Sequence, residues 1–269
     1  SAVRLAGGIP VGVGLIPAED FFYDLAAAES VVSPRTKAMI VNSPHNPTGS
    51  VWTKAQLEQV AAFAIKHDLV LISDEAYDRM LYDGRTHFSP AAFPGMRERT
   101  IMCGSLSKTY AMTGWRVGYI VAPEPVINAA VRLQQNIMLC TSTFVQMGAI
   151  AGLTESQEAV QRMVQEFGRR RKLMIQMIEQ TPGLKLEAVP GGAFYVFPKV
   201  VLPGVSSAKL ADYLLNQAGV ATVDGANFGT LGDGYLRISY AVSHENCREG
   251  MERIAAVTSG IMAGSISLS

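Results

Sequence analysis

Short apolar runs alternate along the chain with longer segments in which apolar residues recur every three or four positions. The short runs have the length and composition of buried strands, and the longer segments have the periodicity of amphipathic helices. Predicted strands lie at 36–41, 69–72, 100–104 and 117–121, and predicted helices run from 53, at 123–138 and at 156–180. This alternation predicts an α/β fold with a mostly parallel sheet flanked by helices.

The remainder of the chain has a different pattern, with shorter strands and fewer helices. Predicted strands lie at 185–189, 193–197, 220–223 and 235–240, and predicted helices lie at 208–217 and from 244, where Ser243 is a candidate N-cap. We therefore expect a large α/β domain over 1–170 and a smaller C-terminal α+β domain over 171–269. The opening residues, 2–13, have the pattern of a strand, so we expect the chain to start within a strand and the large domain to be incomplete at its N-terminus.

Composition excludes several classes of protein. The 269 residues carry 23 Lys and Arg against 23 Asp and Glu, so no net charge favours nucleic acid or an anionic membrane. No apolar stretch reaches the roughly 18 residues that a membrane span needs, and no cleavable signal peptide is recognised. The four histidines and three cysteines show no metal-binding spacing or disulfide framework. These features predict a cytoplasmic protein without metal whose partner is a small molecule.

Four polar stretches follow predicted strands or lie on them, where α/β proteins usually form their sites. They are NSPHNPTG at 42–49, SDEAY at 73–77, GSLSKTYAMTGWRVGY at 104–119 and YLRISY at 235–240. Each has an ordinary interpretation by itself: a turn-rich loop, a helix N-cap, a surface lysine and an outward-facing arginine. Their occurrence together in one chain requires a common explanation.

In this order and spacing the four stretches resemble the class I/II aminotransferases, which are pyridoxal-phosphate enzymes of fold type I, and among them the aspartate aminotransferase type. The segment SLSK followed by TGWRVGY is the most diagnostic part. The resemblance extends over nearly the whole chain. It implies the fold-type-I large domain with a smaller C-terminal domain, and pyridoxal 5′-phosphate as the cofactor.

The resemblance implies that four residues bind the ring of the cofactor and its substituents. Lys108 is the lysine that binds the pyridoxal aldehyde and moves a proton as general base and acid. Asp74 lies beside the pyridine nitrogen, so that the ring acts as an electron sink. Tyr77 and Asn46 reach the phenolic oxygen. Lys108, Asp74 and Tyr77 are thus the expected catalytic residues.

The resemblance also implies which residues bind the two anionic groups, the cofactor phosphate and the substrate α-carboxylate. Ser105, Ser107 and Arg116 are expected to bind the cofactor phosphate, with Arg116 presenting a bidentate fork. Arg237 is expected to bind the substrate α-carboxylate, with assistance from Asn46.

The implied activity is the exchange of an amino group between an amino acid and a 2-oxo acid in amino acid metabolism, by a homodimer. Two alternatives keep the resemblance: a carbon–sulfur β-lyase with the same residues, and a non-catalytic aminotransferase-like sensor domain. Relatives carry roughly a third of their length before the segment that begins here, so the chain is expected to be the carboxy-terminal part of such an enzyme. We therefore expect weak or absent transamination by this chain alone.

Overall fold

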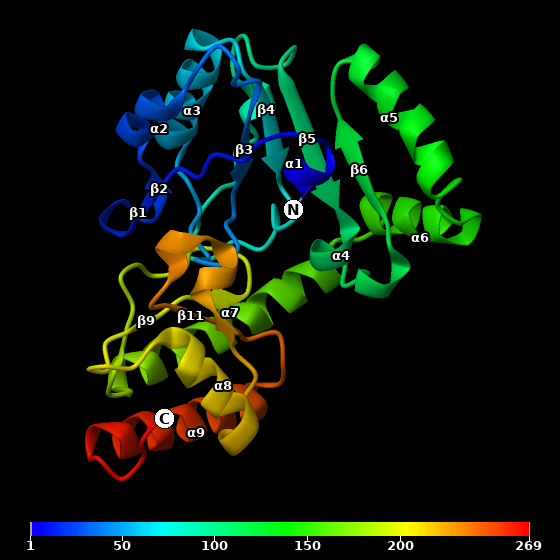
Figure 1. Ribbon diagram of the computed structural model, residues 1–269. Helices are drawn as coiled ribbons and strands as arrows, with labels where there is room; N and C mark the ends of the chain where they lie inside the picture. Colours follow the sequence, from blue (N-terminus) through cyan, green and yellow to red (C-terminus); the bar gives the residue numbers. More distant parts are fainter. Residues whose placement is uncertain (1, 269) are drawn as a thin grey trace.

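A four-stranded sheet lies at the centre of the upper part of the computed structural model, which describes residues 2–268 (Figure 1). In spatial order its strands are β3 (Ala38–Asn42), β4 (Val70–Asp74), β5 (Thr100–Ser105) and β6 (Gly118–Val121). The first three strands run parallel, whereas β6 is antiparallel to β5. The parallel strands therefore end at one edge of the sheet, and this edge faces the lower part of the molecule.

Helices cover the sheet and its sides. In Figure 1, α2 (Leu25–Val31) and α3 (Lys54–Lys66) lie on the left, and α5 (Glu124–Ile137) and α6 (Thr143–Thr154) lie on the right beside β6. The predicted start of α3 is confirmed, because the Thr53 hydroxyl accepts from the backbone nitrogen of Gln56 and the Gln56 side chain accepts from that of Thr53. Buried Trp52, Leu57 and Leu71 belong to the core between α3 and the sheet.

The lower part contains α7 (Glu158–Gln180), α8 (Ser207–Ala218) and α9 (His244–Met262). They surround an antiparallel sheet in the order β10 (Val223–Asp224), β11 (Leu236–Ser239) and β8 (Tyr195–Val196). A second pair is formed by β7 (Leu184–Lys185) and β9 (Lys199–Val200). The apolar side chains Met174, Leu210, Leu236 and Met251 are almost completely buried in one core, which holds the helices against the sheet.

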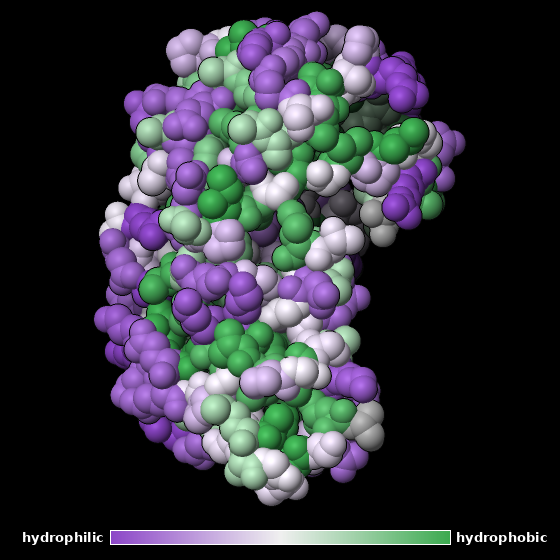
Figure 2. All heavy atoms as spheres, turned by 60° about the vertical axis from the view of Figure 1, so that its left-hand side comes forward, coloured by the Kyte–Doolittle hydropathy of each residue, from purple (hydrophilic) through white to green (hydrophobic). Residues whose placement is uncertain are grey.

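Short elements complete the chain. They are α1 (Ala2–Leu5), α4 (Leu106–Thr109), the pair β1 (Leu15–Ile16) and β2 (Phe22–Tyr23), and 3-10 turns at Pro17–Glu19, Pro90–Ala92, Thr113–Trp115, Gly225–Phe228 and Thr230–Gly232. The upper and lower parts meet through loop backbone: Gly49 accepts from the nitrogens of Gly191 and Gly192, both at 2.8 Å. In the space-filling view the outline narrows between the two parts, and hydrophobic patches lie among hydrophilic residues on both (Figure 2).

The predicted fold class is confirmed, and the longer elements lie within a few residues of their predicted positions. The strand expected at 2–13 is wrong: α1 occupies its start, and residues 6–14 have no helix or strand. This segment contains Gly7, at φ 78°, and Pro10, which lacks an amide donor, so it is poorly suited to pairing in a sheet.

Three small strands are shorter than predicted, and two helices of seven or more residues were missed, besides the four-residue α1 and α4. β7, β8 and β10 have only two residues each. The run at 193–197 is limited by Ala193 at φ 55° and by Pro198, neither of which suits an extended strand. The longer missed helices are α2, which is capped by the Asp24 side chain, and α6.

No helix within residues 2–268 is long and apolar enough to span a membrane.

Candidate active site

The carboxyl ends of the three parallel strands bring Asn42, Asp74 and Cys103 side by side. The Asn42 amide nitrogen donates to the Asp74 carbonyl oxygen at 3.0 Å, and its amide oxygen accepts from the backbone nitrogen of Asn46 at 2.9 Å. One asparagine thus fastens the 42–49 loop to the end of β4. It fixes two predicted site residues, Asn46 and Asp74, relative to each other.

Asp74 is the last residue of β4 and begins the turn that carries Tyr77. Its Oδ1 accepts from the backbone nitrogen of Ala76 at 3.2 Å. Burial raises the pKa of the Asp74 carboxyl above its ordinary value, and the neighbouring Glu75 carboxylate adds to the effect. A cationic or protonated group placed against Asp74 would relieve this cost, since an opposite charge favours the ionised carboxylate.

Tyr77 lies buried against a residue from the lower part of the molecule. Its hydroxyl lies 3.0 Å from the hydroxyl of Tyr195 on β8. Burial, followed by this hydrogen bond, raises the pKa of Tyr77 well above its ordinary value. The Tyr77 phenol therefore stays protonated at neutral pH and can donate a hydrogen bond.

Arg237 on β11 is held between two aromatic rings and the 42–49 loop. Its guanidinium carbon lies 4.7 Å from the centre of the Tyr195 ring and 4.9 Å from that of Phe228. Its Nη1 donates to Asn46 Oδ1 at 3.1 Å, while its Nε is buried without a hydrogen-bond partner among the described residues. A buried guanidinium N–H without an acceptor is a suitable position for a bound carboxylate.

Lys108 reaches the same group of side chains through Phe194. It lies on α4, directly after β5, and its Nζ is 5.7 Å from the centre of the Phe194 ring. That ring packs edge-on against Tyr77, with 5.6 Å between the centres. Within residues 2–268 no carboxylate forms an ion pair with Lys108, so its amine is not engaged in a salt bridge there.

The three expected phosphate-binding residues lie on neighbouring backbone segments. Ser105 caps α4, and its hydroxyl accepts from the backbone nitrogen of Ser107 at 3.2 Å. Pairing of β5 with β6 places Gly118 opposite Ser105. Arg116 is exposed, with φ at 56°, and donates to the Thr113 carbonyl oxygen at 2.9 Å. In the described part of the chain no hydrogen bond joins Arg116 to either serine, so their common role stays a prediction.

Two aromatic residues of this site, Phe194 and Tyr195, are not among the residues predicted from the sequence. Tyr195 and Phe194 lie in the AFYVF run after Gly191 and Gly192, which was interpreted as a strand. Tyr195 contacts both Tyr77 and Arg237. The hydroxyl group of a tyrosine on an otherwise apolar strand was the available signal in the sequence. The residues that this hydroxyl contacts depend on how β8 packs against the turn after β4.

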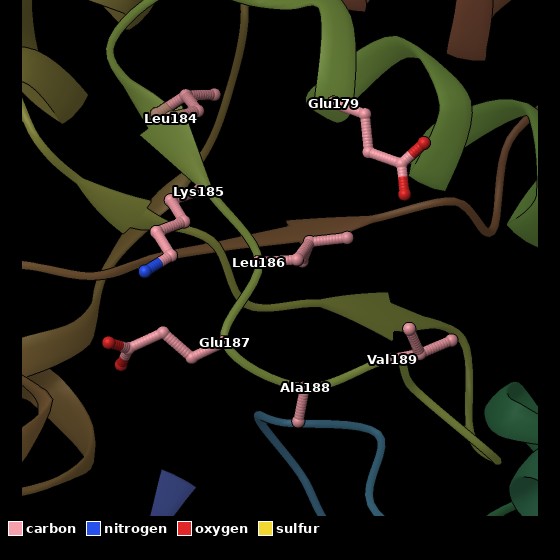
Figure 3. Close-up of a pocket in the computed structure, with 7 residues that line it drawn as sticks. All are labelled: Glu179, Leu184, Lys185, Leu186, Glu187, Ala188 and Val189. Carbon is pink, nitrogen blue, oxygen red and sulfur yellow. The ribbon is translucent and has the colours of Figure 1, made fainter. Parts of the chain in front are cut away.

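One open pocket of the lower part lies away from these residues. It measures about 420 Å³ and is lined by Glu179 and residues 184–189 (Figure 3). The side chains of Lys185 and Glu187 extend to one side of this segment and Leu186 to the other (Figure 3). None of the predicted site residues lines it. The polar cluster around Arg237 is therefore the better candidate, because it gathers groups of complementary chemistry. Residues 2–268 contain no cluster of His, Cys, Asp and Glu that could hold a metal ion.

Comparison with known proteins agrees with this arrangement. Residues 1–254 match the family described as aminotransferase class I and II, and the chain belongs to this family. The cofactor of the family is pyridoxal 5′-phosphate.

Individual relatives include enzymes with different named substrates. The chain is 43% identical to aromatic-amino-acid aminotransferase 2 of Thermococcus litoralis, over 95% of this chain and 66% of the relative. It is also 43% identical to the aspartate aminotransferase of Pyrococcus abyssi, with the same two coverages. The chain thus spans about two thirds of the length of the curated relatives it matches.

Solved structures share the fold. The aromatic aminotransferase of Pyrococcus horikoshii superposes with a TM-score of 0.92 at 42% identity, over 96% of this chain and 69% of that one. A double mutant of Thermus thermophilus aspartate aminotransferase gives 0.87 at 39% identity, over 94% and 65%. These matches support a fold-type-I arrangement for the described residues.

The residues present fit the cofactor at its ring and less completely at its phosphate. Lys108 supplies an amine without an ion pair to any residue of 2–268, Asp74 a half-buried carboxyl with a raised pKa, and Tyr77 a protonated phenol. These groups suit an aldehyde, a pyridine nitrogen and a phenolic oxygen, respectively. Ser105 and Arg116 have the right chemistry for a phosphate. In this structure, however, the Arg116 guanidinium is directed to the Thr113 carbonyl oxygen.

Proposed function

We propose that the protein is a pyridoxal-phosphate-dependent aminotransferase that moves an amino group between an amino acid and a 2-oxo acid. The position of Arg237 carries the proposal. Its buried Nε has no acceptor, its Nη1 is held by Asn46, and the Tyr195 ring beneath it contacts Tyr77. An α-carboxylate bound there would place an amino acid between Arg237 and the side chains of Tyr77 and Lys108.

The residue roles follow from the chemistry of each side chain. When bound, the cofactor supplies an electron sink that stabilises negative charge at the substrate Cα. Lys108 would hold the cofactor aldehyde, and its Nζ, once freed, would move the proton from the substrate Cα to C4′ of the cofactor. Asp74 holds the proton on the pyridine nitrogen. Tyr77 donates from its hydroxyl to the phenolic oxygen, with Asn46 as a second donor. Ser105, Ser107 and Arg116 bind the phosphate, and Arg237 with Asn46 binds the α-carboxylate.

Aspartate and aromatic amino acids are the first substrates to test, since relatives of both names are similar to this chain. The two substrate classes differ in their side chains but share the α-carboxylate that Arg237 would bind. Arg237 therefore does not discriminate between the two substrate classes.

The organisation of the chain belongs to the same proposal. We assign the large domain to 1–170 and the small domain to 171–269, and we expect a homodimer in the cytoplasm.

The exposed surface of α5 and β6 supports the dimer. No residue of α5 and none of β6 is buried, and Leu133, Ile137 and Val121 are exposed there. Apolar surface of this kind is typical of a protein interface, which supports the dimer. The three cysteines are free thiols, which suits a reducing compartment.

The experiment is an amino-transfer assay on the purified chain with added pyridoxal phosphate. Aspartate and phenylalanine serve as donors and 2-oxoglutarate as acceptor, and glutamate formation is measured. A Lys108→Ala variant prepared in parallel is the control for uncatalysed transfer. Glutamate formed only with Lys108 present supports the proposal. Ammonia and pyruvate formed from a cysteine conjugate, without glutamate, would instead assign the β-lyase activity. Glutamate formed equally by the Lys108→Ala variant would overturn the proposal, because the transfer would then not depend on the lysine that holds the cofactor.

A further inference from the structure

A second carboxylate lies directly beside Asp74 and has no part in the residue roles above. Glu75 is 6% exposed, and Oε1 of its carboxylate accepts from the hydroxyls of Ser73, at 2.9 Å, and Ser89, at 2.7 Å. His87 Nε2 lies 2.7 Å from the other oxygen, Oε2. The His87 tautomer with its proton on Nε2 donates to this oxygen. Three donors thus surround one buried carboxylate.

Glu75 is placed where it controls the geometry of the turn. Its backbone nitrogen donates to the Cys103 carbonyl oxygen at 2.9 Å, so pairing with β5 continues one residue beyond Asp74. Its carbonyl oxygen accepts from the backbone nitrogen of Asp78 at 3.1 Å, which closes the turn containing Tyr77. Successive side chains of an extended segment point to opposite faces. Holding Glu75 on one face therefore fixes the direction of Asp74 on the other.

The donors come from a loop that has little regular structure of its own. His87 and Ser89 precede the short 3-10 turn Pro90–Ala92, and His87 is followed by Phe88, which packs on the core under the sheet. A buried carboxylate is stable only while its hydrogen bonds are made, so Glu75 and this loop hold each other in place. The side-chain partners of Glu75 among the described residues, Ser73, His87 and Ser89, form no hydrogen bond with Arg237.

We propose that Glu75, held by Ser73, His87 and Ser89, is a positioning residue that fixes the directions of Asp74 and Tyr77. The part of the inference that concerns the cofactor rests on the proposed function. The part that concerns the order of the turn does not. Glu75 acts through the backbone of the turn and touches neither substrate nor cofactor.

The test compares Glu75→Ala and Glu75→Gln with the unchanged chain, and uses Glu187→Gln as the matched control. Glu187 is a partly buried carboxylate in the lower part of the molecule, and like Glu75 it accepts hydrogen bonds from side chains, those of Tyr235 and Lys199. Hydrogen exchange of the backbone amides of residues 74–80 is measured without cofactor. Pyridoxal phosphate is then titrated, with the dissociation constant and the visible circular dichroism of the bound cofactor as readouts.

We expect Glu75→Ala to speed exchange in 74–80 about tenfold or more, with little change in α9. It should weaken cofactor binding by about tenfold and reduce the visible dichroism. Glu75→Gln, which keeps an acceptor for the two hydroxyls, should show the same changes in smaller measure. Glu187→Gln should change neither readout. If Glu75→Ala does not fold, Glu75→Gln alone decides by the same criteria.

Unchanged exchange at 74–80 in the Glu75 variants would overturn the inference, whether or not cofactor binds. Equal losses with Glu187→Gln would also overturn it, since the effect would then be general destabilisation. Failure of the unchanged chain to bind pyridoxal phosphate would count against the proposed function alone, and the exchange measurement would still decide the role of Glu75.

Discussion

Nη1 of Arg237 donates to Oδ1 of Asn46 at 3.1 Å, across a separation of 191 residues in the chain. Asn46 belongs to the loop that follows β3 in the upper sheet, whereas Arg237 lies on β11 in the lower one. The hydrogen bond therefore joins the two parts of the molecule at the candidate site. The same arginine contacts the Tyr195 ring, and Tyr195 in turn contacts Tyr77. The site is formed only when both parts are folded and in contact.

Replacing Arg237 by lysine should damage substrate binding and leave cofactor binding nearly intact. Lysine keeps the charge but cannot present two parallel N–H donors to a carboxylate or stack between Tyr195 and Phe228. We expect kcat/KM for the preferred amino acid to fall about 100-fold, mainly through KM. Steady-state kinetics at saturating cofactor measure this effect.

The matched control is Arg253→Lys on α9, where the arginine pairs with Glu249 at the surface. That variant should keep the kinetics of the unchanged chain. A comparable loss in both variants, or none in Arg237→Lys, would show that Arg237 does not bind the carboxylate.

Gly49 should not tolerate a side chain. Its φ is 73°, and a Cβ built on it would lie 2.4 Å from Pro190 Cβ and 3.0 Å from the Tyr195 carbonyl oxygen. Gly49→Ala should therefore lower the free energy of unfolding by about 1 kcal/mol for the backbone conformation and by about 1–3 kcal/mol more for the overlap. Urea unfolding followed by circular dichroism measures the change.

Gly84 separates the two contributions. It has φ at 71°, but a Cβ there would meet nothing within 4 Å. Gly84→Ala should show only the backbone effect. Equal losses in the two variants would mean that the 42–49 loop and the segment around Pro190 do not pack as closely as the structure shows.

His45 should make stability depend on pH between about 4 and 6.5. Burial lowers its pKa from 6.5 to about 4, and its ring contacts Thr48 and stacks on Trp52. In this range the unfolded chain binds more protons at His45 than the folded chain does, so the unfolding free energy rises with pH. The contribution is fully present above pH 6.5 and decreases as pH falls toward 4, by up to about 3 kcal/mol.

Other groups also titrate in this range, so the comparison must be made with a His45→Gln variant. Urea unfolding at several pH values gives the slope for each protein. The slope should be smaller in the variant than in the unchanged chain between pH 4 and 6.5. Identical slopes would mean that His45 is accessible to protons in the folded state.

Local pattern was sufficient for the elements that bury one face against a large core. The Thr53 capping box and the apolar positions Leu57, Val60 and Ala61 located α3, because capping and periodicity are local properties of the sequence. The strands of the lower sheet were less predictable. β10 has two residues and exists because it pairs with β11, which is a tertiary contact that no short window of sequence contains.

The residues of the candidate site likewise include some that local sequence could predict and some that it could not. The stretches that contain Asn46, Asp74 and Lys108 stood out because polar residues after parallel strands gather at one edge of a sheet, and the resemblance then assigned these three residues. Tyr195 was not predicted, because its contacts with Tyr77 and Arg237 depend on how the upper and lower parts pack. Arg116 was predicted to bind the phosphate because of the residues around it in the sequence. Its positive φ and its hydrogen bond to the Thr113 carbonyl oxygen could not be derived from those residues.

Attachment of the cofactor to Lys108 tests the account most directly. The chain is incubated with pyridoxal phosphate, reduced with borohydride and digested, and the modified peptide is located by mass spectrometry. The account predicts a pyridoxyl group on Lys108, none on an exposed lysine such as Lys54, and no label in the same peptide of a Lys108→Arg variant. Label spread over surface lysines, or absent from the Lys108 peptide, would contradict it.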